Sequence, residues 1–361
     1  MALVLILSER IFTSLIWLAD RFPDMVRYKF SPIMPNSVQR VSDFLRESQP
    51  FFYWPNDGNI GDLLIAVATR QFFRREKLSY KEWDASSSVQ PRPSTLVYGG
   101  GGRFVPHWGS LDSFVETMTA PWVQRCIILP HSIRHVDAFV QSFDERFTVF
   151  CRDAETLNYV SFLNPRVQCI PADDMAMQYR LEEQWCEVAH TDQGRRDEME
   201  GNALLERGFA SEVEKMVRRS SSTIQWEGAH HRVAFILRRD KEKLSSAESP
   251  FSCDPNSRWY THCLEASCNT PILSAIFRAL DYPDSIVTDR LHVAVMGCLL
   301  GKQVYMLDND YGKLGGVYRQ TLRRFGNVHY VGNNVWPEPV SAAWRKLNSP
   351  MKLFIHRLFG C

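Results

Sequence analysis

The sequence lacks the signatures that identify the common metal and nucleotide sites. Its nine cysteines form no C-x-x-C pair and no H-E-x-x-H occurs, so no zinc site is predicted. Neither a G-x-G-x-x-G fingerprint nor a glycine-rich loop ending in Lys-Ser or Lys-Thr is present, which argues against a dinucleotide-binding oxidoreductase and a P-loop enzyme. The number of cysteines is odd and several lie in apolar surroundings, so we expect reduced thiols in a reducing compartment.

A strong excess of charge is also absent. The formal net charge is +1, whereas general nucleic-acid binders carry a basic excess, so no nucleic-acid partner is expected. The apolar N-terminus is interrupted at residues 8–10, which leaves no membrane-spanning run, and it lacks the basic start of a signal peptide. We expect an amphipathic helix that either packs on the core or rests on a membrane. The basic amphipathic tail over residues 341–361 either docks on the first domain or binds an anionic membrane surface.

What the sequence does have is a core-forming composition and an alternating pattern. Apolar residues make up 45% and charged residues 23% of the chain, as in soluble globular proteins. Short apolar runs alternate with helical patterns, which predicts an α/β fold with parallel sheets. The alternation stops in a polar stretch and then resumes, so we expect two Rossmann-like domains facing a cleft. The expected division is a first domain over residues 1–185, a polar helical connection over 186–231, a second domain over 232–340 and the tail over 341–361.

Ligands of doubly wound sheets bind beyond the carboxyl ends of the strands, and several motifs of the first domain fall there. "PNDGNIGD" and "YGGGG" place small residues at strand ends, where a ligand can approach the backbone. Asp153, Asp173 and Asp174 end later strands; most such acids cap the following helix, but one could act as a base. For His131 the simpler explanation is a structural histidine, and for "YGGGG" it is a flexible loop. The candidates on this side are Asn59, Gly61, Asp62, Gly100, Gly101, His131, Ser132 and Asp173.

The second domain has cations where an anion could bind. Arg238 and Arg239 end a buried strand, and one of them must point toward its exit because strand side chains alternate. Arg290 and His292 lie in the first turn of an apolar helix, where a bound anion would offset the cost of a cation at a helix N-terminus. The two arginine positions predict a site for a small dianion or trianion, and His292 can transfer a proton near neutral pH. The residues that follow the next strand are Asp308, Asn309 and Lys313.

These motifs together resemble one protein family. "NIGDLLI", "YGGGG", "LPHS", "FCRD", "ADD", "LRRDKE", "VTDRLH" and "LDNDYGKLGGVY" occur in that order between Tyr53 and Tyr318, and the series resembles the polysaccharide pyruvyl transferase family. The resemblance implies a two-domain fold like that of GT-B glycosyltransferases and the transfer of a pyruvyl group from phosphoenolpyruvate to a sugar as a ketal. The implied Arg/Arg/His donor site is Arg238, or its neighbour Arg239, with Arg290 and His292. The full set of implied donor-binding residues is Arg238, Thr288, Arg290, Leu291, His292 and Lys313.

The implied chemistry agrees with the residues. Phosphoenolpyruvate carries a carboxylate and a phosphate, which suit two arginines and a helix start. His292 would protonate carbon C3 of the donor, and a base would help a sugar hydroxyl to attack C2. The candidates for this base are His131, Asp62 and Asp173.

The expected partners are phosphoenolpyruvate and a glycan or lipid-linked oligosaccharide acceptor. The glycine loops with Phe104 and Trp108 would form the acceptor cleft, and no metal or further cofactor is required. We expect a cytoplasmic protein, and a lipid-linked acceptor would place it at the inner face of the plasma membrane through its terminal segments. Two alternatives stay open: a GT-B glycosyltransferase that uses a nucleotide sugar, and a non-catalytic glycan-binding protein that kept the fold.

Overall fold

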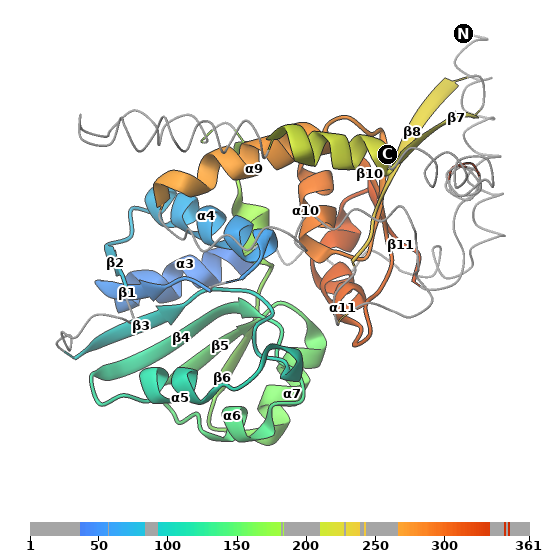
Figure 1. Ribbon diagram of the computed structural model, residues 1–361. Helices are drawn as coiled ribbons and strands as arrows, with labels where there is room; N and C mark the ends of the chain where they lie inside the picture. The colour runs from blue at the N-terminus through green and yellow to red at the C-terminus, as the bar shows by residue number, and fades with distance from the viewer. Residues whose placement is uncertain are drawn as a thin grey trace, which may run out of the picture. The chain divides into compact units, whose positions relative to one another are not determined.

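Two β-sheets with mainly parallel strands form the framework of the described chain (Figure 1). The structure is a computed structural model that describes residues 37–56, 58–83, 93–181, 183, 210–226, 229–238, 242, 266–332, 343 and 346. These residues belong to one compact unit. The expected N-terminal amphipathic helix lies outside the described residues, and so does the tail apart from two isolated positions. No described helix combines the length and the apolar character needed to cross a membrane.

The first sheet has six parallel strands in the order β2-β1-β3-β4-β5-β6. They are β1 (Phe51–Trp54), β2 (Tyr80–Glu82), β3 (Ser94–Tyr98), β4 (Val123–His131), β5 (Phe147–Cys151) and β6 (Gln168–Pro171). β1 pairs with β2 on one side and with β3 on the other, so the strand order reverses there. Such a switch point opens a ligand-binding crevice at the carboxyl ends of the strands. β1 and β3 lead into "PNDGNIGD" and "YGGGG", and both glycine motifs therefore meet at the switch point.

The second sheet has five strands in the order β11-β10-β9-β8-β7. They are β7 (Ser221–Trp226), β8 (Ala229–Ile236), β9 (Ser285–Thr288), β10 (Gln303–Met306) and β11 (Val328–Tyr330). β8 to β11 are parallel, and β7 pairs with β8 in the antiparallel sense. β7 lies within the stretch that we expected to be a polar helical connection, of which residues 210–219 are helical. The sequence of β7 looks polar because an edge strand needs apolar side chains on one face only.

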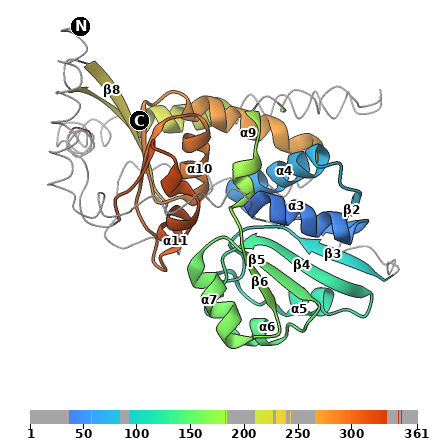
Figure 2. The same ribbon diagram turned by 180° about the vertical axis from the view of Figure 1, so that it is seen from behind.

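Helices cover both faces of the first sheet. α3 (Ser37–Ser48) and α4 (Ile60–Arg75) lie on one face, and α5 (Asp112–Met118), α6 (Asp137–Gln141) and α7 (Ala154–Leu163) lie on the other (Figures 1 and 2). The second sheet is accompanied by α9 (Ala266–Leu280), α10 (Leu291–Leu299) and α11 (Lys313–Gln320). The short 3-10 helices are η1 (Pro106–Trp108), η2 (Met175–Gln178) and η5 (Leu322–Arg324). β5 is buried along its whole length and β4 is buried from Cys126 onward, as expected for parallel strands covered on both faces.

Helices of the two sheets pack against one another. α4 contacts both α9 and α10, and the rings of Tyr179 and Phe277 stack with their centroids 5.0 Å apart. One apolar cluster includes residues from both sheets. The predicted α/β fold class is confirmed, whereas the division into two domains and the cleft between them stay predictions.

Candidate active site

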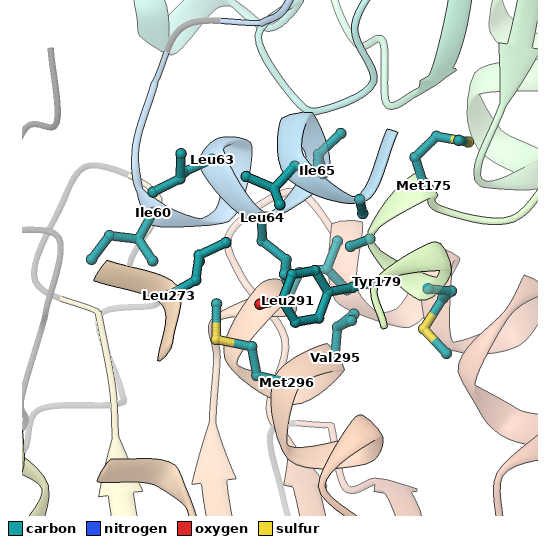
Figure 3. Close-up of a cluster of buried hydrophobic side chains, with 14 of the residues drawn as sticks. Ile60, Leu63, Leu64, Ile65, Met175, Tyr179, Leu273, Leu291, Val295 and Met296 are labelled. Atoms are coloured by element: carbon teal, nitrogen blue, oxygen red, sulfur yellow. The ribbon is translucent and has the colours of Figure 1, made fainter. Parts of the chain in front are cut away.

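A shared apolar cluster holds the starts of α4 and α10 side by side. Figure 3 shows Leu64 of α4 near Leu291 and Val295 of α10 with Tyr179 beside them, and Ile60 of α4 farther along the same cluster. All five side chains are buried. Leu291, which the family resemblance places among the donor-binding residues, thus uses its side chain to fix the helix. Because this packing fixes both helix starts, the polar residues in their first turns are brought together.

Asn59 and Asp62 cap the start of α4 through reciprocal hydrogen bonds. The Asn59 side chain accepts from the N–H of Gly61 at 2.8 Å, and the Asp62 carboxylate accepts from the N–H of Asn59 at 3.1 Å. The side-chain amide of Asn56 donates a further bond of 2.9 Å to Asp62. A helix cap is therefore one role of Asp62, and these donors fix its position.

Asp62 also has charged neighbours from both sheets. Burial raises the pKa of Asp62, despite the opposing influence of His292, Lys313 and Arg152. A carboxyl group whose pKa is raised toward neutral pH exchanges a proton more readily under ordinary conditions. The environment of Asp62 therefore suits proton transfer as well as capping.

The ring of His292 lies between Gly61 and Asp174. A Cβ on Gly61 would stand 2.0 Å from Nδ1 of His292, so glycine is required for the ring to approach the start of α4 this closely. On the other side, Nε2 of His292 is 3.6 Å from Oδ2 of Asp174, and the histidine side chain is 15% exposed. A carboxylate at this distance can orient the ring and balance a positive charge on it.

Asp174 is held by a buried arginine. Arg152 Nη1 donates to Oδ2 of Asp174 at 2.6 Å, and Arg152 Nε donates to Oγ of Ser132 at 2.9 Å. Burial alone would raise the pKa of Asp174, but the charge of Arg152 and the contact with His292 hold it well below its usual range. Ser132, a predicted acceptor-binding residue, is fully buried and donates to Asp153 at 2.5 Å. Its hydroxyl therefore serves this internal network.

Asp173 points away from this network. Its carboxylate accepts from Oγ of Ser37 at 2.8 Å, from Oγ1 of Thr321 at 3.0 Å and from Nη2 of Arg324 at 2.7 Å. It thus ties α3 to the segment after α11. The structure places Asp173 in a structural cluster, and its neighbour Asp174 is the residue that faces the site.

The buried carboxylate of Glu242 pairs with two cations beside the second sheet. Oε2 of Glu242 accepts from Nη1 of Arg238, from Nζ of Lys313 at 3.1 Å and from Nδ2 of Asn309 at 3.2 Å. Burial would raise the pKa of Glu242, but Lys313 and Arg238 lower it to about 2. Arg238 and Lys313 are both predicted donor-binding residues, and they meet at the same oxygen atom. Arg239 lies outside the described residues.

The turn before α10 is fixed by hydrogen bonds. Arg290 is the N-cap residue and is buried, and its N–H donates to Oγ1 of Thr288 at 3.0 Å. The Thr288 hydroxyl in turn donates to the carbonyl of Ile236 at 2.6 Å. Asp289 accepts the N–H of Arg238 at 2.8 Å, and burial raises the pKa of Asp289 to about 6. Thr288 and Asp289 therefore position the two arginines by holding the backbone on which they stand.

His131 is buried behind the glycine loop. Its Nε2 accepts from the N–H of Arg103 at 3.1 Å, and its ring stacks on Phe104 with the centroids 4.3 Å apart. Burial, followed by the charge of Arg152, holds the pKa of His131 well below its usual value. A neutral ring whose acceptor nitrogen is already engaged is poorly placed to act as a base. Phe104 is fully buried and lies beneath the loop.

The glycine loop itself packs closely on its neighbours. A Cβ on Gly100 would stand 2.8 Å from the carbonyl oxygen of Pro130, and one on Gly101 would stand 2.3 Å from the side-chain amide of Asn56. Gly101 also has a φ of +145°, which L side chains rarely adopt. Backbone packing therefore requires these glycines, and their contact with a ligand stays a prediction.

Sequence reasoning gave no role to three charged residues of this site, Arg152, Glu242 and Asp289, which occur only within the quoted motifs. It named Asp174 only as one of three strand-end acids that cap a helix or act as a base. Their partners come from distant segments, so no local signal distinguishes them. A charged residue directly after a buried strand is the one feature that Arg152 and Asp289 share in the sequence.

The arrangement can bind an anionic ligand and move a proton. Buried cations surround the ends of the strands, and His292 with Asp174 and Asp62 provides groups for acid–base chemistry. In the part of the chain that the structure describes, no group of three or more His, Cys, Asp or Glu residues is placed to hold a metal ion.

Comparisons with known proteins bear on the fold and on the family of the chain. A solved structure of an uncharacterised protein from Klebsiella pneumoniae subsp. pneumoniae is similar, with 23% identity over 82% of this chain and 99% of that one and a TM-score of 0.60; this is a likeness of fold. A solved structure of an SsGBP variant matches with 8% identity, coverages of 85% and 96% and a TM-score of 0.19, too low to indicate a shared fold. No curated protein matches the sequence.

The model of the family described as polysaccharide pyruvyl transferase matches residues 59–311, which is more than half of the chain. The protein therefore belongs to the polysaccharide pyruvyl transferase family.

Proposed function

We propose that the protein moves the pyruvyl group of phosphoenolpyruvate onto two hydroxyls of a sugar as a ketal, with release of phosphate. The acceptor sugar belongs to a polysaccharide or to its lipid-linked precursor. The observation that carries the proposal is the position of His292 beside Asp174, at the start of α10 and against the start of α4. Membership of the family supports the reaction class.

The cations suit a donor with two anionic groups. Phosphoenolpyruvate carries its carboxylate and its phosphate on the same carbon, C2, so its binding groups must lie close together. Arg238 and Lys313 meet at one oxygen of Glu242, which keeps both of them close and in place. Arg290 begins α10, and the N-terminus of that helix adds partial positive charge.

We assign to His292 the role of the acid that protonates C3, because the Asp174 carboxylate 3.6 Å from its Nε2 can balance the charge of the protonated ring. The proton adds to C3 and leaves C2 electron-poor, so that a sugar hydroxyl adds to C2. The bond between C2 and the phosphate oxygen then breaks, its electron pair leaves with phosphate, and a second hydroxyl closes the ketal. Two hydroxyl protons are released: one replaces the proton that His292 gave to C3, and the other leaves with phosphate.

Asp62 is the candidate base that the geometry favours. Its raised pKa and its nearness to His292 suit a group that takes a proton from a sugar hydroxyl. His131 is a weaker base because burial holds its pKa well below the usual value. Asp173 faces other elements, since its carboxylate accepts from Ser37, Thr321 and Arg324.

A panel of simple acceptors tests the proposal. The purified protein is incubated with phosphoenolpyruvate and aryl glycosides of galactose, glucose or mannose, and both phosphate release and product mass are measured. We expect phosphate release that needs donor and acceptor together, a product heavier by one pyruvate less one water, and a large loss of both in His292→Ala. The same acceptors are also incubated with nucleotide sugars. Transfer of a sugar there, without any pyruvylated product from phosphoenolpyruvate, would favour the glycosyltransferase alternative.

A further inference from the structure

Asn56 links a buried tyrosine to the candidate base. The hydroxyl of Tyr98 donates to Oδ1 of Asn56 at 2.8 Å, and Nδ2 of Asn56 donates to Oδ1 of Asp62 at 2.9 Å. Asn56 is 3% exposed and Tyr98 is 1% exposed, whereas Asp62 is partly exposed. This chain of hydrogen bonds therefore runs from the interior beside the first sheet to a carboxylate that a substrate can reach.

Tyr98 fixes the direction in which the Asn56 amide faces. Tyr98 is the last residue of β3, and its ring packs on Trp54 and Phe104 with the centroids 5.2 Å and 5.1 Å apart. Its hydroxyl is therefore held in place to donate to the amide oxygen. A flipped amide would instead set that oxygen against the Asp62 carboxylate, where two acceptors would repel each other. The NH2 group of Asn56 is thus directed at Asp62.

The glycine loop packs directly against this hydrogen bond. A Cβ on Gly101 would stand 2.3 Å from Nδ2 of Asn56 and 3.0 Å from Oδ1 of Asp62, and one on Gly99 would stand 2.6 Å from the backbone nitrogen of Asn56. Side chains at these two positions would push the amide and the carboxylate apart. A hydrogen bond that is shielded from water is electrostatically stronger than an exposed one. The glycines of "YGGGG" therefore act on Asp62 through Asn56.

We infer that Asn56, anchored by Tyr98, is a positioning residue that aims the Asp62 carboxylate and keeps it ionised, ready to take a proton from the sugar hydroxyl. The role of Asp62 as this base rests on the proposed function. A donor bound to the ionised carboxylate favours its charged form. Oδ1 and Oδ2 of Asp62 each accept one bond from Asn56 or Asn59, and a carboxylate oxygen has two lone-pair sites. A place for the hydroxyl of the acceptor therefore remains on Asp62.

Charged groups from three other elements also act on Asp62. They are His292 on α10, Lys313 on α11 and Arg152 after β5, and all three lower its pKa against the effect of burial. A substitution at Asn56 or Tyr98 leaves these groups in the chain. A change in the titration of Asp62 can then be assigned to the altered hydrogen bond.

Asn56→Asp tests the inference with almost no change of shape. One oxygen atom of the new side chain can still accept from Tyr98, but the other would face Asp62 across the present 2.9 Å contact, and two such carboxylates share a proton. We expect the acidic limb of the pH profile of kcat/KM to move upward by about 1–2 pH units or more, so activity lost at neutral pH returns in alkaline solution. Asn164→Asp is the matched control, since this buried asparagine donates to the backbone carbonyls of residues 140 and 143. It should lower stability without moving the profile.

A titration of Asp62 itself supplies a readout that needs no turnover. The protein is isotope-labelled at the aspartate carboxyl carbon for nuclear magnetic resonance, and the signal of Asp62 is identified by its loss in Asp62→Asn. We expect the midpoint of this titration to rise in Tyr98→Phe, because the Asn56 amide loses its anchor, and to rise further in Asn56→Asp. Tyr98→Phe removes only one hydroxyl group, so it keeps the test valid if Asn56→Asp does not fold.

The outcomes separate this inference from the proposed function. An Asp62 midpoint that is the same in wild type and in the folded variants overturns the inference. So does a kcat/KM that falls equally at every pH in Asn56→Asp, as expected of a purely structural asparagine. A shifted midpoint in a protein that never consumes phosphoenolpyruvate would keep the positioning role of Asn56 and refute the pyruvyl transfer. Pyruvyl transfer with an unmoved midpoint and an unmoved pH profile would do the reverse.

Discussion

An asparagine in place of Asp174 would keep the shape of the side chain and remove its charge. The carboxylate is fully buried, accepts from Nη1 of Arg152 at 2.6 Å and from the N–H of Ala176 at 2.9 Å, and lies 3.6 Å from Nε2 of His292. The two bonds end on different oxygens of the carboxylate, so the single amide oxygen of asparagine can keep only one of them, and its NH2 group would face the other donor. Asp174→Asn therefore loses one hydrogen bond as well as the negative charge between the guanidinium and the imidazole.

The lost charge should lower stability in a pH-dependent way. Breaking a buried ion pair costs about 3–5 kcal/mol, and we expect a loss of unfolding free energy of this size because the charge and one of the two hydrogen bonds are lost together. The pKa of Asp174 is lower in the folded chain than the value of about 3.9 in an unfolded one. Its charge therefore stabilises the fold above about pH 4, and this contribution is lost as the pH falls toward the folded pKa. Denaturant unfolding should show the largest difference from wild type near neutral pH.

The same substitution should lower kcat by about 10²-fold, the lower end of what a positioned proton-transfer group contributes. The assay is phosphate release from phosphoenolpyruvate with an acceptor sugar. If Asp174 acts through His292, adding Asp174→Asn to His292→Ala lowers kcat little further. Asp173→Asn is the matched control, since this buried neighbour contacts Ser37, Thr321 and Arg324, and it should lose stability but keep kcat. An unchanged kcat in Asp174→Asn, or an equal loss in Asp173→Asn, would refute the reasoning.

Three further substitutions test other parts of the site. Gly61→Ala puts a methyl group 2.0 Å from Nδ1 of His292 and should lower kcat by about tenfold or more through a displaced ring; wild-type kcat in this variant would contradict the contact. Glu242→Gln removes a carboxylate whose pKa is about 2 in the folded chain and about 4.3 in an unfolded one. It should lower the unfolding free energy by on the order of 3 kcal/mol at pH 7, and by progressively less as the pH falls from about 4 to 2. A difference in unfolding free energy between wild type and variant that does not change with pH would contradict this. Asp289→Asn removes a carboxyl whose pKa burial raises to about 6, above the value of about 3.9 in an unfolded chain. Its ionisation therefore lowers stability progressively as the pH rises from about 4 to about 6, and in full above that. The variant should unfold at a higher denaturant concentration than wild type at pH 8 but not at pH 4.

The regular elements could be predicted because their signals are local. The apolar run "PFFYW" became β1, and the helical spacing after "NIGD" became α4. The prediction that Arg290 and His292 stand at the start of a helix is confirmed, with Arg290 as the N-cap residue of α10. Apolar periodicity and cap residues act over a few residues, so a single sequence records them directly.

The pairing of charges across the fold could not be predicted. The sequence does not show which of Asp173 and Asp174 faces the site, since both follow β6. Arg152 and the N–H of Ala176 hold Asp174, and the packing of α10 brings His292 to it. Glu242 likewise meets Lys313 from 71 positions away, and its role depends on where the chain brings the segment after β8. The strand β7 was missed for a related reason, because its sequence is polar on its exposed face and its partner β8 decides that it pairs.

Calorimetric titration of the wild-type protein with phosphoenolpyruvate, alongside nucleotide sugars and free nucleotides, tests the central claim most directly. The account predicts saturable binding of phosphoenolpyruvate, no binding of the nucleotides, and loss of the phosphoenolpyruvate signal in Arg290→Ala. Binding of a nucleotide or nucleotide sugar without any binding of phosphoenolpyruvate would contradict it.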